Sequence, residues 1–166
     1  MIFPRVVSAI DRRIIARIIF IILFIATATA IFIFSSQPQN VSDSVSTKVS
    51  DAVSDSALKV MTPPKIGKIQ IPFRKYAHMY LYALLGICAM SAALTWHTKL
   101  YYKLPAALLV CFAYAASDEF HQKFVDGRSC EWRDVGFDSI GYGAGILLVL
   151  LLWYICSKYI KLLWRK

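Results

Sequence analysis

Apolar residues fall in four runs along the chain, separated by polar segments. The runs read "IIFIILFIATATAIFIF", "MYLYALLGICAMSAALTW", "LPAALLVCFAYAAS" and "SIGYGAGILLVLLLWYI". A membrane-spanning helix needs about 20 mainly apolar residues, with about 17 as the lower limit. The first, second and fourth runs reach that length when their flanking residues are counted. The third run is shorter and reaches it only if residues 118–120 form its last turn. We therefore predict transmembrane helices at residues 18–34, 75–96, 104–120 and 135–156.

The segment between the first two runs has a different pattern. Small apolar residues recur every fourth position among Ser, Asp, Thr and Lys, at Val41, Val45, Val49, Val53 and Ala57. This spacing indicates one narrow apolar stripe on a helix that lies on the membrane surface or over the bundle. Pro63 and Pro64 would end the helix because proline cannot continue the hydrogen-bond ladder. The alternative is a mobile polar linker, since Val and Ser are modest helix formers.

Composition supports a membrane protein. The chain has 166 residues, of which 58% are hydrophobic and 17% charged, whereas soluble proteins average about 45–50% and about 25%. A single soluble core of this size cannot bury so much apolar surface. We predict one all-α domain, residues 1–166, embedded in the membrane. The first run continues past its small residues as "IFIF", which favours a retained helix over a cleaved secretory signal.

Four spanning helices fix which polar segments share a side. Residues 35–74 and 121–134 must lie on one side, and residues 1–17, 97–103 and 157–166 on the other. Arg12, Arg13 and Arg17 directly precede the first run, and basic residues near the first helix favour the cytoplasm. We therefore predict a multi-pass plasma-membrane protein with both termini cytoplasmic, which places residues 35–74 and 121–134 outside.

Three of the predicted helices carry a polar stripe near the outer boundary. Residues three or four positions apart share a helical face. The stripes are Lys75, His78, Tyr82 and Gly86; Tyr114, Asp118 and Gln122; and Asp134, Asp138, Gly141 and Gly145. If the stripes face inward, they form one site in which "SDEFHQ" meets Lys75 and His78. Gly141 and Gly145 would let a neighbouring helix approach closely.

The side chains of this site suit an anionic headgroup. Arginine holds a phosphate or carboxylate through two hydrogen bonds, and lysine acts as a point charge. Asp118 or Glu119 beside His121 would form an acid–base pair. The candidate reacting groups are Asp118, Glu119, His121 and His78, and the candidate binding groups are Lys75, Arg74, Tyr82, Gln122, Arg128 and Asp134. The alternative is that the cations only neutralise the nearby acids.

No established catalytic motif narrows the chemistry further. The chain lacks a serine elbow, a phosphate-binding loop and an HExxH sequence, so no reaction class follows. His78, His121, Asp118 and Glu119 are of the types that ligate metals. Hydrogen-bonded pairs of histidine and carboxylate satisfy the same side chains without a metal, and we favour the pairs.

Four stretches together resemble the VanZ-like family of small bacterial membrane proteins. They are "FSSQP", "RKYAHMYLYALLG", "SDEFHQKFVDGRS" and "DVGFDSIGYGAG", spread over residues 32–148. As a set they are specific, although each piece is weak by itself. The resemblance implies family-motif positions at Lys75, His78, Asp118, Glu119, Gln122, Arg128, Asp134 and Gly141. The chain departs from the family at Asp126, where proline is frequent, and at Cys130, where glycine is common.

The family is named after a protein that lowers susceptibility to the glycopeptide teicoplanin. We therefore expect a cell-envelope protein that acts on or binds an anionic lipid-linked precursor, such as a polyprenyl phosphate or a wall glycolipid. The rivals are a non-catalytic binder or transporter of such a lipid, and a structural assembly factor. The lipid bilayer is an expected partner and nucleic acid is not. The sequence leaves open the cofactor, the oligomeric state and whether the protein is an enzyme.

Overall fold

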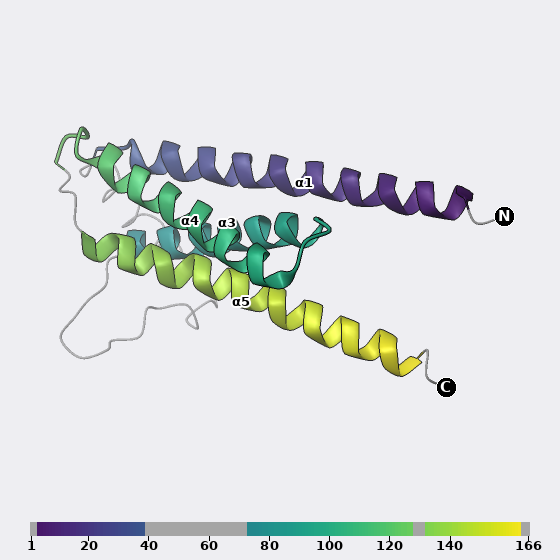
Figure 1. Cartoon of the computed structure of the whole chain (residues 1–166). Helices are drawn as coiled ribbons and strands as arrows, with labels where there is room; N and C mark the ends of the chain where they lie inside the picture. Colours follow the sequence, from purple (N-terminus) through teal and green to yellow (C-terminus); the bar gives the residue numbers. More distant parts are fainter. Residues whose placement is uncertain (1–2, 39–72, 128–131, 164–166) are drawn as a thin grey trace, which may run out of the picture.

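The computed structural model describes residues 3–38, 73–127 and 132–163 and consists there of helices without strands. The helices are α1 (Phe3–Ser35), α3 (Phe73–Leu94), α4 (Leu100–Gln122) and α5 (Trp132–Leu163) (Figure 1). The predicted all-α class is confirmed. The amphipathic helix predicted over residues 41–57 lies outside the described residues.

The four helices lie side by side, and the chain reverses direction between them (Figure 1). Both termini lie at one end of the bundle, here called the termini end, together with the turn between α3 and α4. The opposite end, here called the polar end, holds the last turns of α1 and α4 and the first turns of α3 and α5. The polar stripes therefore meet at one level, as four spans require.

Each described helix is long and apolar enough to cross a bilayer, over residues 12–35, 75–94, 100–122 and 133–159. The chain is thus a multi-pass membrane protein. Two helices are longer than the predicted spans, because α1 begins at Phe3 and α5 continues to Leu163. The apolar run sets the length inside the bilayer, and the backbone can remain helical through polar residues beyond it.

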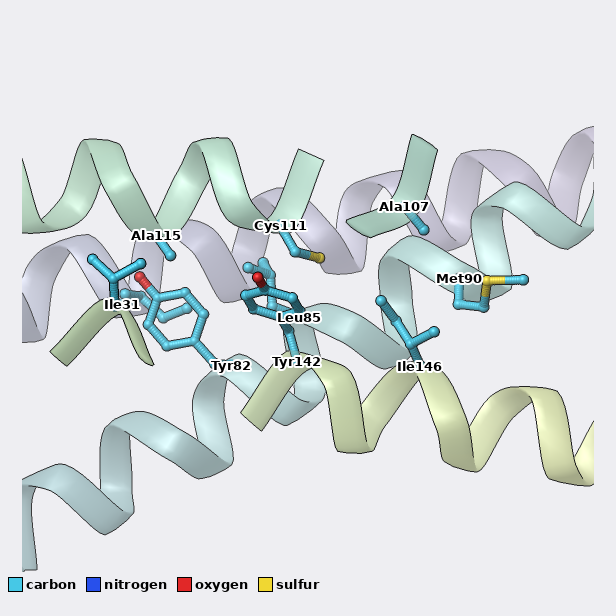
Figure 2. Close-up of a cluster of buried hydrophobic side chains, with 10 residues drawn as sticks. Ile31, Tyr82, Leu85, Met90, Ala107, Cys111, Ala115, Tyr142 and Ile146 are labelled. Carbon is cyan, nitrogen blue, oxygen red and sulfur yellow. The ribbon is translucent and has the colours of Figure 1, made fainter. Parts of the chain in front are cut away.

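The centre of the bundle is α3, which contacts α1, α4 and, most extensively, α5. Tyr82 and Leu85 of α3 are fully buried with Ile31 of α1 and Cys111 of α4 (Figure 2). The Tyr114 hydroxyl of α4 donates a hydrogen bond to the Ala28 carbonyl of α1 at 2.5 Å. In a bilayer such packing and interhelical bonds hold helices together, since lipid supplies no hydrophobic drive between them.

Glycines allow the close approach of α3 and α5. A Cβ added at Gly141 would lie 2.5 Å from the Met79 carbonyl oxygen, and one at Gly145 would overlap the Ala83 carbonyl oxygen. Gly86 on α3 meets the backbone of Tyr142 in the same way. Spaced small residues on both helices therefore set this contact.

The outward faces of the helices are apolar. Ile22 of α1 is 59% exposed, Leu109 of α4 is 67% exposed and Leu147 of α5 is 66% exposed. In water this surface would be unfavourable, whereas in a bilayer it contacts lipid chains. The polar groups that remain are concentrated at the two ends of the bundle.

Candidate functional site

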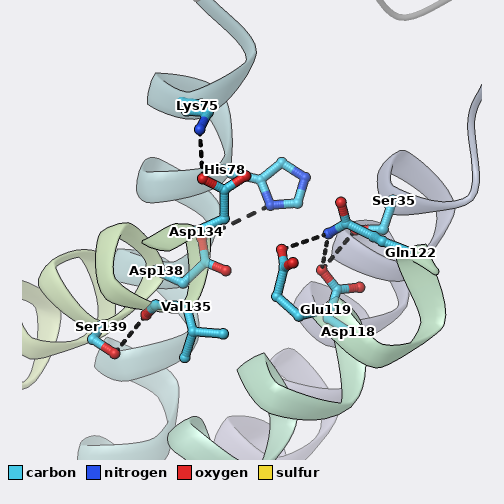
Figure 3. Close-up of polar contacts among 10 residues, drawn as sticks. All are labelled: Ser35, Lys75, His78, Asp118, Glu119, Gln122, Asp134, Val135, Asp138 and Ser139. Carbon is cyan, nitrogen blue, oxygen red and sulfur yellow. Dashed lines mark hydrogen bonds and ion pairs between the residues drawn. The ribbon is translucent and has the colours of Figure 1, made fainter. Parts of the chain in front are cut away.

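Carboxyl side chains from two helices are buried at the polar end. Asp118 and Glu119 of α4 and Asp138 of α5 are each 3% exposed (Figure 3). Residues three or four positions apart on a helix share a face. Asp118 therefore continues the inward face of α4, and Asp138 continues that of α5. Burying such groups costs free energy unless hydrogen bonds or opposite charges offset the loss of water.

Hydrogen bonds from α1 and α4 meet one oxygen of Asp118. Ser35 Oγ donates to Asp118 Oδ2 at 2.8 Å, and Gln122 Nε2 donates to the same oxygen at 3.1 Å. Gln122 Nε2 also lies 3.1 Å from Glu119 Oε1 and donates to it. The last residue of α1 is thereby fixed to the acidic end of α4, and Gln122 holds the two carboxylates of its own helix.

Lys75 has a different partner from the one expected. Its Nζ lies 2.5 Å from Asp134 Oδ1, and the two side chains are 32% and 28% exposed. The expectation that Lys75 meets "SDEFHQ" is therefore wrong: it pairs with α5 rather than α4. The reason is the close α3–α5 contact, which brings the first turns of these two helices together (Figure 3). Lys75 also lies 5.5 Å from the centre of the Phe137 ring.

His78 lies one turn deeper and faces Asp138. Its Nδ1 is 4.0 Å from Asp138 Oδ1, too far for a hydrogen bond but close enough for electrostatic attraction. Tyr82 follows on the same face, with its ring centre 6.1 Å from that of His78. His78, Glu119 and Asp138 point toward a common centre from three helices (Figure 3).

Several buried polar atoms here have no hydrogen-bond partner among the residues described. By hydrogen-bond geometry they are Asp118 Oδ1, Asp138 Oδ2 and the Tyr82 hydroxyl. The Tyr82 hydroxyl nevertheless interacts with the Asp118 carboxylate. An unsatisfied buried polar group costs about 1–3 kcal/mol, and more when it is charged. Asp118 Oδ1 and Asp138 Oδ2 are therefore acceptors that water or a ligand would satisfy.

The contacts that His121 makes are with α1. Its Nε2 is hydrogen-bonded to Ser36 Oγ at 3.1 Å, and its ring stacks on Phe32 at 4.5 Å between centres. The predicted acid–base pair of His121 with Asp118 or Glu119 is replaced by a contact with α1. The i+3 spacing from Asp118 places His121 at the edge of the buried face, where α1 is its neighbour.

Residues 20–154 match the protein-family model described as VanZ/LLP1. The chain belongs to the VanZ/LLP1 family. The match covers most of the chain and includes every polar-end residue named above. No curated protein and no solved structure matches the chain.

Two candidate site residues of this VanZ/LLP1 protein, Arg74 and Arg128, lie partly or wholly outside the described part of the chain. Arg74 belongs to the first turn of α3, but its side chain lies outside the described residues, as does all of Arg128. Two further residues belong to the site: Ser35, which the prediction did not include, and Asp138, which it placed in a polar stripe but not among the reacting or binding groups. The "FSSQP" stretch and the Asp134–Asp138 spacing were the signals for them.

The sequence left open a metal ion held by His78, His121, Asp118 and Glu119, and the positions of side chains that could ligate one can be compared with this alternative. Within residues 3–38, 73–127 and 132–163, no three His, Cys, Asp or Glu side chains are grouped so that they could hold a metal ion. The arrangement instead offers hydrogen-bond acceptors at the centre and one cation, Lys75, at the rim.

Proposed function

We propose that this VanZ/LLP1 protein binds the headgroup of an anionic lipid-linked envelope precursor at the polar end and thereby lowers susceptibility to glycopeptides such as teicoplanin. The observation that carries the proposal is the set of buried acceptors without partners, Asp118 Oδ1 and Asp138 Oδ2. Carboxylates accept hydrogen bonds from hydroxyl and amide groups, and a sugar linked through phosphate to a lipid supplies these donors.

The carboxylates and the cations of the polar end would bind different parts of the headgroup. The buried acidic centre suits sugar hydroxyls or acetamido N–H groups. The phosphate suits Lys75 at the rim, with Arg74 and Arg128 adjacent to the site in sequence. The lipid chain would lie in the bilayer against exposed aromatic rings near this end, such as Phe120, which is 60% exposed. A ligand of this class would offer a phosphate to the cations and hydrogen-bond donors to the carboxylates.

The contacts proposed for the headgroup are compatible with a protein that only binds the lipid and with an enzyme that converts it. If the site catalyses a reaction, Glu119, Asp118 and His78 are the groups placed to move a proton at the headgroup. A binder or transporter would release the lipid unchanged. Mass spectrometry of the lipid recovered after incubation with purified protein separates the two.

The proposal is tested with Asp118→Asn and Asp138→Asn. Native mass spectrometry of the full chain in neutral detergent would measure the binding of a polyprenyl diphosphate that carries an N-acetylhexosamine. We expect each variant to bind at least about tenfold more weakly, since a hydrogen bond to a charged group contributes about 1.5–3 kcal/mol. Thermal stability should be unchanged or raised, because each substitution removes a buried charge.

Asp126→Asn is the matched control, since Asp126 is exposed at the same end and loses the same charge. Cells that express the variants would be compared for teicoplanin tolerance. Retained binding of the probe together with a large loss of stability in the buried variants would show that the carboxylates are structural, and the proposal would be wrong.

A further inference from the structure

A second polar site lies at the termini end, remote from the carboxylates. A pocket of about 660 Å³ opens there between α1, the end of α3 and the start of α4. Its polar lining includes Arg13, His97, Thr98 and Lys103, and its apolar lining includes Phe20 and Trp96. No Asp or Glu is among the lining residues in the part of the chain that the structure describes. The pocket is therefore cationic without a compensating acid.

Contacts with the α3–α4 turn hold the basic residues of this end in place. Arg13, which lines the pocket, has its Nη1 3.1 Å from His97 Nδ1. Arg17 lies next to the lining and binds the turn. Arg17 donates from Nε to Thr95 Oγ1 at 3.1 Å and from Nη2 to the Thr95 carbonyl at 3.2 Å. Its guanidinium lies 4.4 Å from the centre of the Trp96 ring. Lys103 Nζ donates to the Leu94 carbonyl at 3.3 Å. Guanidinium and ammonium groups carry more N–H donors than these bonds use, so donors remain for an anion.

The start of α4 adds positive potential at the same place. The helix begins at Leu100 with no acidic residue in its first turn, and Lys99 gives no side-chain cap. The first N–H groups of a helix lack intrahelical partners and carry a partial positive charge. Lys103 lies in this region and lines the pocket.

Apolar and interfacial side chains surround the cations. Trp96, which lines the pocket, is 51% exposed. Tyr101 in the first turn of α4 is 78% exposed, and Ile14 and Ile18 are exposed along α1. Tryptophan and tyrosine are enriched where the bilayer meets water, so the pocket lies at headgroup depth. A ligand that fits must be anionic at one end and apolar at the other.

We propose that this pocket binds the phosphodiester headgroup of an anionic phospholipid. Arg13 and Lys103 would contact the phosphate, and the acyl chains would follow the exposed face of α1. Basic pockets between transmembrane helices commonly bind anionic headgroups. The site is separate from the polar end and does not depend on the function proposed for it.

The test uses the full chain in neutral detergent with added phosphatidylglycerol, phosphatidylcholine of matched acyl chains, or soluble glycerol phosphate. Phosphatidylglycerol should raise the melting temperature by about 5 °C at saturation, and the other two should not. Arg13→Gln and Lys103→Gln should each weaken the apparent affinity for phosphatidylglycerol about fivefold. Native mass spectrometry would count the retained lipid.

Lys158→Gln is the matched control, because it removes an exposed cation from α5 near the same end but outside the pocket lining. It should retain the affinity of the unmodified protein. Equal protection by phosphatidylcholine or by glycerol phosphate would overturn the proposal. So would a loss of affinity in Lys158→Gln as large as in Arg13→Gln, since the effect would then be general surface charge.

Discussion

Buried carboxylates are the residues that most separate function from stability in this protein. Asp118 and Asp138 are 3% exposed and each keeps an oxygen without a described hydrogen-bond partner. A fold selected for stability alone would place apolar side chains there, since replacing buried ionic groups with apolar ones is often neutral or stabilising. Asp118 accepts one interhelical bond, from Ser35, and the binding role proposed for the remaining oxygens is what the Asp118→Asn and Asp138→Asn variants test.

The Lys75–Asp134 pair gives a prediction at this scale. Lys75→Met should lower the melting temperature by a few degrees, because it leaves Asp134 half-buried without its cation. The double variant Lys75→Met/Asp134→Asn should recover that loss, as a double-mutant cycle in purified protein would measure. If Lys75 also binds the headgroup phosphate, teicoplanin tolerance should stay lost in the double variant. A return of both stability and tolerance would limit Lys75 to neutralising Asp134.

Sequence spacing predicted which faces of the helices carry polar groups but not how these groups pair. Residues three and four apart placed His78 and Asp118 on inward faces, where the structure finds them. The partner of Lys75 depends on which helix packs closest, and that is decided by glycines and backbone approach between α3 and α5. His121 likewise faces α1 because of the position of that helix, which no local pattern encodes.

At the scale of elements, apolar runs predicted the number and order of the described helices, because a bilayer demands about 20 apolar residues per span. The ends were less predictable. The run that starts at Ile18 is preceded by further helix back to Phe3, since basic residues such as Arg and Lys are good helix formers. Hydropathy therefore locates the span and not the whole helix.

The glycines of α5 give the second prediction. Gly145→Ala should destabilise the bundle by about 1–3 kcal/mol, because its Cβ would overlap the Ala83 backbone. Gly143→Ala is the control, since nothing lies within 4 Å of an added Cβ there. Alanine favours a helix over glycine, so that variant should be unchanged or slightly more stable. Thermal unfolding in detergent measures both, and equal melting temperatures would mean that α3 and α5 are less close than described.

At the scale of the whole molecule, the two ends of the bundle differ in charge. Buried carboxylates gather at the polar end, and Arg13, Arg17 and Lys103 lie around the α3–α4 turn at the termini end. Basic residues beside transmembrane helices favour the cytoplasmic side. The proposed orientation therefore places the pocket of the termini end inside the cell and the acidic site outside.

Cysteine labelling tests this orientation. In intact cells, an impermeant thiol reagent should label a variant that retains only Cys130, which lies between α4 and α5 in the sequence. A variant whose only cysteine replaces Thr98, which is exposed in the turn between α3 and α4 and lies outside the spans, should react only after lysis. Cys88 and Cys111 are buried and serve as unreactive controls. The reverse labelling pattern would place both termini outside.

The acidic face of α4 also constrains how the protein is made. α4 is the least apolar of the four described spans, and acidic side chains oppose partition of a nascent segment into lipid. When α4 leaves the ribosome, α1 has already been delivered and offers Ser35 and the Ala28 carbonyl as partners for Asp118 and Tyr114. We therefore expect α4 to insert with help from α1, so that its polar groups find their partners in the order in which the helices are synthesised.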